Sequence, residues 1–230
     1  MSGSRATLAT IPFFRGVPPE IARRHESRAT WLQAEPGQLI LDFDDVSDDV
    51  FFVLTGSVRV AVRTAGGREV ILTDAAPGQF FGEMAAIDGA PRSAAVTALH
   101  RSRICRLPAP AFLALLADAP ELSLRLMRVL VTRVREANAR ILELTSLDIR
   151  HRLYAELLRE AGPAAGDGSR AISPPPVQQI LANRIGARRE AVSREIARLL
   201  REGMLHRTRG ALVLRQPDKL ARAVSEMLAD

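Results

Sequence analysis

The feature that most limits the fold is a change of sequence pattern near Pro108. Between Ala29 and Leu107, short apolar runs typical of strands follow one another: LILDF, VFFVLTG, SVRVAVR, REVILTD, SAAVTAL and SRICRL. Turn sequences such as EPGQ, TAGG and APGQ separate these runs. Because no helical segments alternate with the runs, a parallel α/β sheet is disfavoured. The pattern predicts an antiparallel β domain, built as two sheets or a flattened barrel.

Helical patterns account for most of the remaining chain. PPEIARRHES and PAPAFLALLAD predict short helices before and after the β domain. From Pro120 to Ser146 the sequence predicts one long helix, because neither Gly nor a further Pro interrupts it. Its apolar residues recur at alternating steps of three and four: Met127, Leu130, Val134, Ala137, Ile141 and Leu144. Such a heptad seam favours a parallel dimer, and a helix packed on its own β domain is the alternative.

The last third of the chain reads as a compact helical unit. Asp148 is expected to be the N-cap of a helix over IRHRLYAELLRE, and GPAAGDGSRAISPPP is expected to be a loop or linker. From Val177 the pattern predicts helices, a β-hairpin at HRTRGALVLRQ and a last helix from Asp218.

Charge and cysteine content narrow the class of protein. The net charge is +6, and residues 148–230 hold 15 Lys and Arg against 10 Asp and Glu, whereas the earlier residues are nearly balanced. This basic stretch is typical of a protein that binds a polyanion, nucleic acid first. Cys105 is the only cysteine, so an intrachain disulfide and a four-cysteine iron–sulfur site are excluded. We expect a cytoplasmic protein without membrane segment, metal site or catalytic nucleophile–base pair.

A helix-turn-helix is predicted in VQQILANRIGARREAVSREIARLLREG, where Gly186 separates two helical patterns. The buried face of the second helix would carry Val192, Ile196 and Leu199. Its tip and outer face hold the residue types that read base edges in a major groove: Arg188, Arg189, Glu190, Ser193 and Arg194. Five further arginines are interpreted as phosphate contacts or solvated charges: Arg184, Arg198, Arg201, Arg207 and Arg209. HRTRG has the composition of a basic wing.

The stretch FGEMAAIDGAPRSAAV, residues 81–96, suggests a second binding site. Gly82 permits close approach of a ligand, and Arg92 with Ser93 can bind a phosphate. Glu83 has the wrong charge for a phosphate but can accept a hydrogen bond from a ribose hydroxyl. A nucleotide carries both a phosphate for Arg92 and Ser93 and a ribose hydroxyl for Glu83. From the residues alone, a Glu83–Arg92 ion pair that closes a surface loop is an equal alternative.

The same stretch resembles the phosphate-binding cassette of cyclic-nucleotide-binding domains, with the form F-G-E-[LM]-A…P-R-[ST]-A. LTSLDIRHRL resembles the hinge, and RREAVSRE the recognition helix, of the Crp/Fnr superfamily of transcription regulators. The likeness extends over essentially the whole chain. It implies an α+β protein with three parts: a β-roll sensory domain in residues 1–118, a dimerisation helix in 119–147 and a winged helix-turn-helix in 148–230.

The resemblance also implies roles for single residues. Glu83 would bind the ribose 2′-hydroxyl, and Arg92 and Ser93 the cyclic phosphate. The other residues implied at the ligand lie in the cassette or on the long helix: Gly82, Met84, Ala94, Arg133 and Asn138. Where the family has a Thr–Ser pair facing adenine, this chain has Ala137-Asn138. The resemblance implies cyclic AMP as the effector, and this departure keeps cyclic GMP as the alternative.

The function implied is a dimeric regulator that binds double-stranded DNA at an inverted repeat, with half-sites of TGTGA or TTGA type. RNA polymerase is a further candidate partner. Two alternatives stay open. One is a haem or gas sensor, because His25 and His100 lie in the sensory region. The other is a regulator that is active without ligand.

Overall fold

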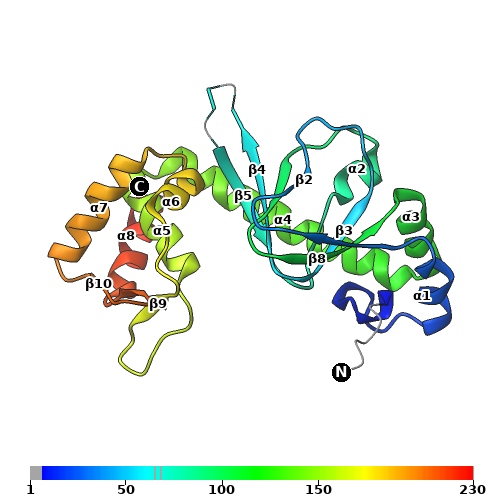
Figure 1. Ribbon diagram of the computed structural model, residues 1–230. Helices are drawn as coiled ribbons and strands as arrows, with labels where there is room; N and C mark the ends of the chain where they lie inside the picture. The colour runs from blue at the N-terminus through cyan, green and yellow to red at the C-terminus, as the bar shows by residue number, and fades with distance from the viewer. Residues whose placement is uncertain (1–6, 65, 68, 230) are drawn as a thin grey trace. The chain divides into compact units, whose positions relative to one another are not determined.

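A computed structural model describes residues 7–64, 66–67 and 69–229 (Figure 1). The chain forms two compact units, one ending at Arg133 and the other beginning at Val134. The boundary lies inside the longest helix, α4 (Pro120–Ser146). This helix has the limits that the sequence predicted.

In the described part of the first unit, the strands form two antiparallel sheets of four strands each, so the predicted two-sheet architecture is confirmed. One sheet has the order β1-β8-β3-β6, with β1 at Thr30–Ala34, β8 at Ser102–Leu107, β3 at Val50–Thr55 and β6 at Phe80–Phe81. The other has the order β2-β7-β4-β5, with β2 at Leu39–Leu41, β7 at Ala95–Ala98, β4 at Val58–Arg63 and β5 at Glu69–Ala75.

Strand β3 explains how this unit is layered. Its residues Val50 to Val53 are all buried, so both of its faces pack against apolar side chains. Phe51 belongs to the core between the two sheets and stacks on Phe81 with ring centroids 5.1 Å apart. Phe52 belongs to a second core. That core is shared with the one-turn helices η1 (Leu8–Thr10) and η2 (Pro12–Phe14) and with α1 (Pro19–Glu26), α3 (Ala109–Asp118) and the first turns of α4.

Among its described residues, the second unit contains four helices besides the end of α4, as well as a small sheet. The helices are α5 (Ile149–Glu160), α6 (Gln178–Ile185), α7 (Arg189–Arg201) and α8 (Pro217–Ala229). The sheet has the order β10-β11-β9, with β10 at Leu205–Arg207, β11 at Leu212–Leu214 and β9 at Arg170–Ile172. The hairpin of β10 and β11 was predicted. The assignment of residues 162–176 wholly to loop was wrong, because β9 lies within this range and pairs with β11. Three residues offer little apolar pattern of their own, so the sequence did not indicate this strand.

Helix ends in this unit follow the predicted signals. The Asp148 carboxylate accepts a hydrogen bond of 2.9 Å from the backbone N–H of His151 and thereby caps α5. Gly186 ends α6 with φ +65°, a left-handed conformation that glycine adopts without strain. The tight turn between α6 and α7 depends on it.

The predicted seam of α4 is largely solvent-exposed within the single chain. Met127, Val134, Ile141 and Leu144 each keep at least half of their surface exposed. Only Leu122 and Leu126 of this helix are buried. An apolar stripe of this kind is expected to pack against another surface. None of the helices in the described residues is both long enough and apolar enough to span a bilayer.

Candidate functional site

The first candidate site surrounds a short helix, α2 (Glu83–Asp88), which follows β6 directly. Gly82 connects the two elements with φ +82°, and a Cβ at this position would lie 2.8 Å from the carbonyl oxygen of Asp49. It would also lie 2.9 Å from Nη1 of Arg92. Gly82 therefore permits a close approach of backbone and guanidinium that a larger residue would prevent.

Glu83 is only 3% exposed, and its carboxylate pairs with Arg133 of α4. Nη2 of Arg133 also donates a 2.7 Å hydrogen bond to the carbonyl of Phe80, and the guanidinium lies 4.8 Å from the centre of the Phe80 ring. Burial raises the pKa of Glu83, and the charge of Arg133 opposes this effect. The loop-closing partner of Glu83 is therefore Arg133, rather than the Arg92 considered from sequence. Glu83 and Arg133, which the resemblance assigns to the ligand, are thus in direct contact with each other.

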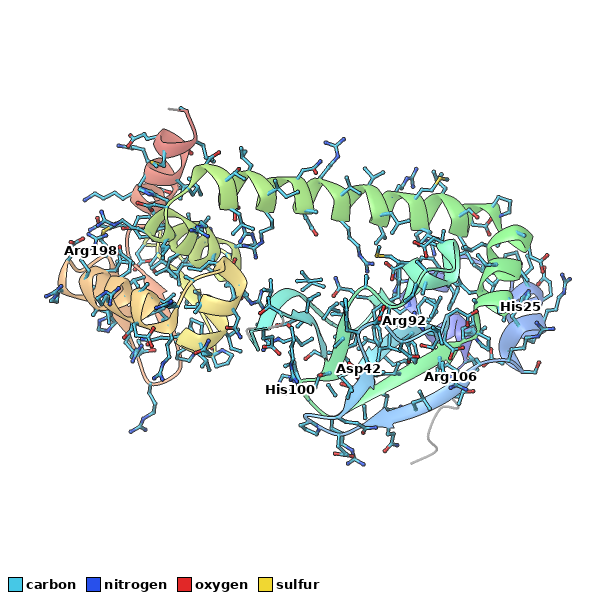
Figure 2. All side chains as sticks on the ribbon, turned by 90° about the horizontal axis from the view of Figure 1, so that it is seen from above. His25, Asp42, Arg92, His100, Arg106 and Arg198 are labelled. Carbon is cyan, nitrogen blue, oxygen red and sulfur yellow. The ribbon has the colours of Figure 1, made fainter. Side chains whose placement is uncertain are left out.

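Arg92 is 4% exposed, and its guanidinium donates to three protein oxygens (Figure 2). Nε donates to Oγ of Ser47 over 3.0 Å, and Nη2 to the carbonyl of Asp49 over 2.8 Å. Nη1 donates to the carbonyl of Gly82 over 2.7 Å. Burial lowers the pKa of Arg92, and nearby carboxylates, with Asp49 first, oppose this change. These bonds engage three of the five guanidinium N–H groups, so a phosphate would have to use the remaining two or replace one of these oxygens.

The remaining predicted cassette residues lie beside α2. Oγ of the exposed Ser93 is 3.9 Å from Sδ of Met84, which is half exposed, while Ala94 is buried. Asn138 is exposed on the part of α4 that belongs to the second unit, so its role toward a base stays a prediction.

The two histidines of the first unit make separate contacts. His25 is buried, and its Nε2 lies 3.1 Å from Asp118. Nδ1 of His100 lies 2.9 Å from Oγ of Ser57. Figure 2 places the two imidazoles at opposite ends of this unit, with Arg92 between them. They do not form a common site. In the part of the chain that is described, no group of three or more His, Cys, Asp or Glu residues could hold a metal ion.

Replacement of Glu83 by Gln should remove a pH-dependent part of the stability. Because the pKa of Glu83 is raised above its ordinary value of 4.5, folding favours the protonated form. The contribution of Glu83 to the free energy of unfolding is fully present below the ordinary pKa. It is lost as the pH rises through the pKa that Glu83 has in the folded protein. Each unit of the rise is equivalent to about 1.4 kcal/mol.

We therefore expect the parent protein to gain free energy of unfolding relative to Glu83→Gln as pH falls from neutrality toward 4.5. Urea titrations of both proteins across this range measure the difference. A parent-minus-variant difference that stays constant with pH would contradict the assignment.

The second candidate site is the exposed face of α7. Arg188, Arg189, Glu190 and Arg194 are exposed and Ser193 is partly exposed. Val192, Ile196 and Leu199 are buried in the core of the second unit, which confirms the predicted inward face. A helix so placed can offer its first turn and outer face to the major groove of DNA.

Two arginines interpreted as phosphate contacts or solvated charges have protein partners instead. Nη1 of Arg184 lies 3.5 Å from Glu156 and 3.2 Å from Glu160. Arg198, labelled in Figure 2, pairs with Glu195 and Glu202 and contacts the hydroxyl of Tyr154. The interpretation as solvated charges is wrong for this pair, because the acidic residues of neighbouring turns and helices were not considered, and a phosphate contact by either arginine stays a prediction. Arg201, Arg207 and Arg209 are exposed, as predicted.

A basic cavity beside α7 was missed from sequence. It has a volume of about 690 Å³ and lies between the start of α5 and the outer part of α7. Five arginines contribute to its lining: Arg150, Arg152, Arg194, Arg198 and Arg201. Its position adds Arg150, near the capped N-terminus of α5, to the candidate phosphate contacts. Nε of Arg150 lies 3.6 Å from Glu195, but the Arg150 side chain is 52% exposed. In the sequence, the one sign of this role is that Arg150 is a basic residue two positions after Asp148.

Comparison with known proteins identifies a domain family for each of the two parts of the chain. Residues 31–119 match the family model of the cyclic nucleotide-binding domain, and residues 151–223 that of the Crp-like helix-turn-helix domain. The chain is 30% identical over 212 residues to the cyclic AMP receptor protein of Thermus thermophilus, covering 89% of this chain and 93% of that protein.

A second relative is the CRP-like cAMP-activated global transcriptional regulator of Mycobacterium tuberculosis. It is 27% identical over 218 residues, which cover 94% of this chain and 97% of the relative. Among solved structures, a CRP/FNR-family transcriptional regulator from Thermus thermophilus is similar with a TM-score of 0.64 and 26% identity, over 85% of this chain and 98% of that one.

Proposed function

The chain belongs to the Crp/Fnr superfamily of transcription regulators, and from that membership we propose a homodimer whose binding to an inverted-repeat operator responds to a cyclic nucleotide. It is a helix-turn-helix transcription regulator with a cyclic-nucleotide-binding domain, and not an enzyme. The observation that carries the proposal is the presence of both sites in one chain. The buried Glu83 begins α2 and the buried Arg92 follows this helix, and exposed arginines lie on α7.

The ligand would bind at the cassette with its ribose 2′-hydroxyl donating to Glu83. Arg92 and Ser93 would bind the cyclic phosphate, Gly82 would allow its approach, and Met84 and Ala94 would line the site. Arg133 already reaches Glu83 from α4, which supports its place beside the ligand. Asn138 would contact the base. Cyclic AMP is the proposed effector because the 30% identical relative is a cyclic AMP receptor protein, and cyclic GMP is the competing choice.

The parts of the chain would divide this work. Residues 1–118 form the sensory domain, 119–147 the dimerisation helix and 148–230 the DNA-binding domain. The exposed seam of α4 supports a parallel dimer, in which two α7 helices would lie one DNA turn apart, roughly 34 Å. Such a protein would work in the cytoplasm, with RNA polymerase as a candidate partner.

Calorimetric titration of the full chain with cyclic AMP, cyclic GMP and 5′-AMP tests the ligand assignment. We expect one cyclic nucleotide to bind and 5′-AMP, which lacks the cyclic phosphate, to bind far more weakly. Absence of heat with both cyclic nucleotides would contradict the assignment. A regulator active without ligand or a haem-dependent sensor would then be favoured.

Arg194→Ala tests base reading by α7. Loss of a guanidinium that contacts a base edge should cost about 1–3 kcal/mol and relax sequence preference at one base step. Arg207→Ala, at the exposed end of β10, is the matched control and should lower the affinity for all DNA sequences equally. Affinities for a panel of single-base operator variants measure both effects. A uniform loss for Arg194→Ala would make this residue a phosphate contact.

A further inference from the structure

Glu156 is a charged residue with no exposed surface, although it lies in a strongly basic part of the chain. It is on α5, and neither proposed binding site uses it. A buried carboxylate is retained only where cations and hydrogen bonds replace its water. Glu156 has such partners on three different helices.

The partners come from α4, α5 and α6. Nη1 of Arg140 on α4 lies 2.8 Å from Oε2 of Glu156, and Nη1 of Arg184 on α6 lies 3.5 Å from Oε1. Arg159, one turn further along α5, pairs with the same carboxylate and also with Glu143 of α4. Arg140 lies 3.4 Å from Glu143, and Arg184 lies 3.2 Å from Glu160.

We call these six residues the Glu156 cluster: Arg140, Glu143, Glu156, Arg159, Glu160 and Arg184. The cluster contains equal numbers of acids and arginines, so its charge is balanced. It joins the end of α4 to the helix that precedes the helix-turn-helix and to the first helix of that motif.

The apolar core of the second unit makes no comparable connection. Among the described residues, that core draws on α5 to α8 and on β9 to β11, and it contains no residue of α4. Two leucines at the end of α4 make apolar contacts. Leu147 is buried, and a Cβ built on Gly186 would lie 3.6 Å from Cδ2 of Leu144. Apolar contacts specify direction weakly, whereas charge-assisted hydrogen bonds depend on angle and distance.

We propose that the Glu156 cluster fixes the direction in which α4 joins the helix-turn-helix, so that Glu156, Glu143 and Arg140 are positioning residues for DNA recognition. Besides the cluster, the peptide at Leu147-Asp148 and the contacts of the two leucines link the two chain segments. Because each arginine bonds more than one acid, rotation of α4 against α5 breaks several pairs together. A cooperative network of this kind favours discrete arrangements over gradual bending.

The consequence for regulation rests on the proposed function. If α4 carries the dimer contact and α7 reads DNA, then the cluster determines whether ordering of α4 changes the spacing of the two α7 helices. Weakening the Glu156 cluster should uncouple the ordering of α4 from the spacing of the two α7 helices. The nucleotide would still bind, but its effect on DNA affinity would be lost.

Glu143→Gln tests the cluster with the smallest change, because it removes one charge from α4 and leaves the buried Glu156 with all three of its arginine partners. Glu136→Gln is the matched control, since Glu136 is exposed and occupies the same heptad position one repeat earlier. Both variants are made in the full chain, and thermal unfolding verifies that each is folded.

The primary readout is the distance distribution between spin labels on α4 and α7. Labels are attached at Ala139→Cys and Ala197→Cys, both exposed sites, with excess unlabelled protein to suppress signals between chains. Cys105 does not interfere, because it is buried and burial raises its pKa to about 12. We expect one narrow population for the parent and for Glu136→Gln, and a broadened or second population for Glu143→Gln. An unchanged narrow distribution in a folded Glu143→Gln would overturn the proposal.

The second readout is DNA affinity with and without saturating cyclic AMP, measured on the unlabelled proteins. Glu143→Gln should lose the nucleotide-induced gain, and Glu136→Gln should keep it. If cyclic AMP leaves the parent's DNA affinity unchanged, the proposed effector fails, while the distance measurement still decides the role of the cluster. If Glu143→Gln broadens the distances but keeps the parent's full gain, the positioning role in regulation is refuted.

Discussion

Glu156→Ala is expected to lower the free energy of unfolding of the second unit by about 3–5 kcal/mol. The side chain has no exposed surface, and its removal leaves Arg140 and Arg184 without the carboxylate that compensates their partial burial. Breaking a buried pair costs far more than the pair contributes, because the remaining charge stays in a low-dielectric environment. Urea unfolding followed by circular dichroism measures the loss.

Glu202→Ala is the control variant that distinguishes the effect of removing a buried charge from the effect of removing an exposed one on the free energy of unfolding. Glu202 lies in the same unit and pairs with Arg198, but its side chain is 43% exposed. Exposed pairs of this kind contribute about 0–1 kcal/mol. Similar losses for the two variants would show that Glu156 behaves as a surface charge, against the burial that the structure gives it.

Arg92→Ala is expected to weaken cyclic-nucleotide binding by roughly 100-fold, which corresponds to about 3 kcal/mol. A guanidinium can give a phosphate two parallel charge-assisted hydrogen bonds, and alanine offers none. The substitution should also lower the melting temperature, because Arg92 bonds Ser47, Asp49 and Gly82 in the free protein. Calorimetry below the melting temperature of the variant measures affinity separately from stability.

Two companion variants make the Arg92 result interpretable. Ser93→Ala removes a hydroxyl from an exposed residue and leaves the bonds of Arg92 in place, so it should reduce affinity by roughly ten-fold with little change in melting temperature. Arg23→Ala removes an exposed arginine of α1 and should change neither. If folded Arg92→Ala binds the nucleotide as tightly as the parent, Arg92 is a structural residue only.

Much of the fold follows from local signals in the sequence. The limits of α4, the Asp148 cap, the Gly186 turn and the inward face of α7 depend on residues close together in the chain, and all were predicted. Strand β9 was not, because a three-residue strand is stabilised mainly by its partner β11. Periodicity over such a short segment carries little information.

The partners of the charged residues could not be predicted, because they come from distant parts of the chain. Glu83 and Arg92 were recognised as a pair of site residues, yet Glu83 bonds Arg133, fifty positions away, and Arg92 bonds oxygens of residues 47 and 49. Arg184 was interpreted as a phosphate contact or a solvated charge, whereas the fold brings it to Glu156 of α5. Residue type indicated the chemistry of each group, and only tertiary structure determines which oxygen each cation meets.

The central claim is that a cyclic nucleotide controls DNA binding by this chain. Its most direct test is the fluorescence anisotropy of a labelled duplex, selected by the protein from random DNA in the presence of both cyclic nucleotides. We predict that saturating cyclic AMP, or else cyclic GMP, tightens binding by roughly ten-fold or more, and that Arg92→Ala abolishes this gain. Equal affinity with and without either nucleotide would contradict the claim and leave a DNA-binding regulator that does not respond to them.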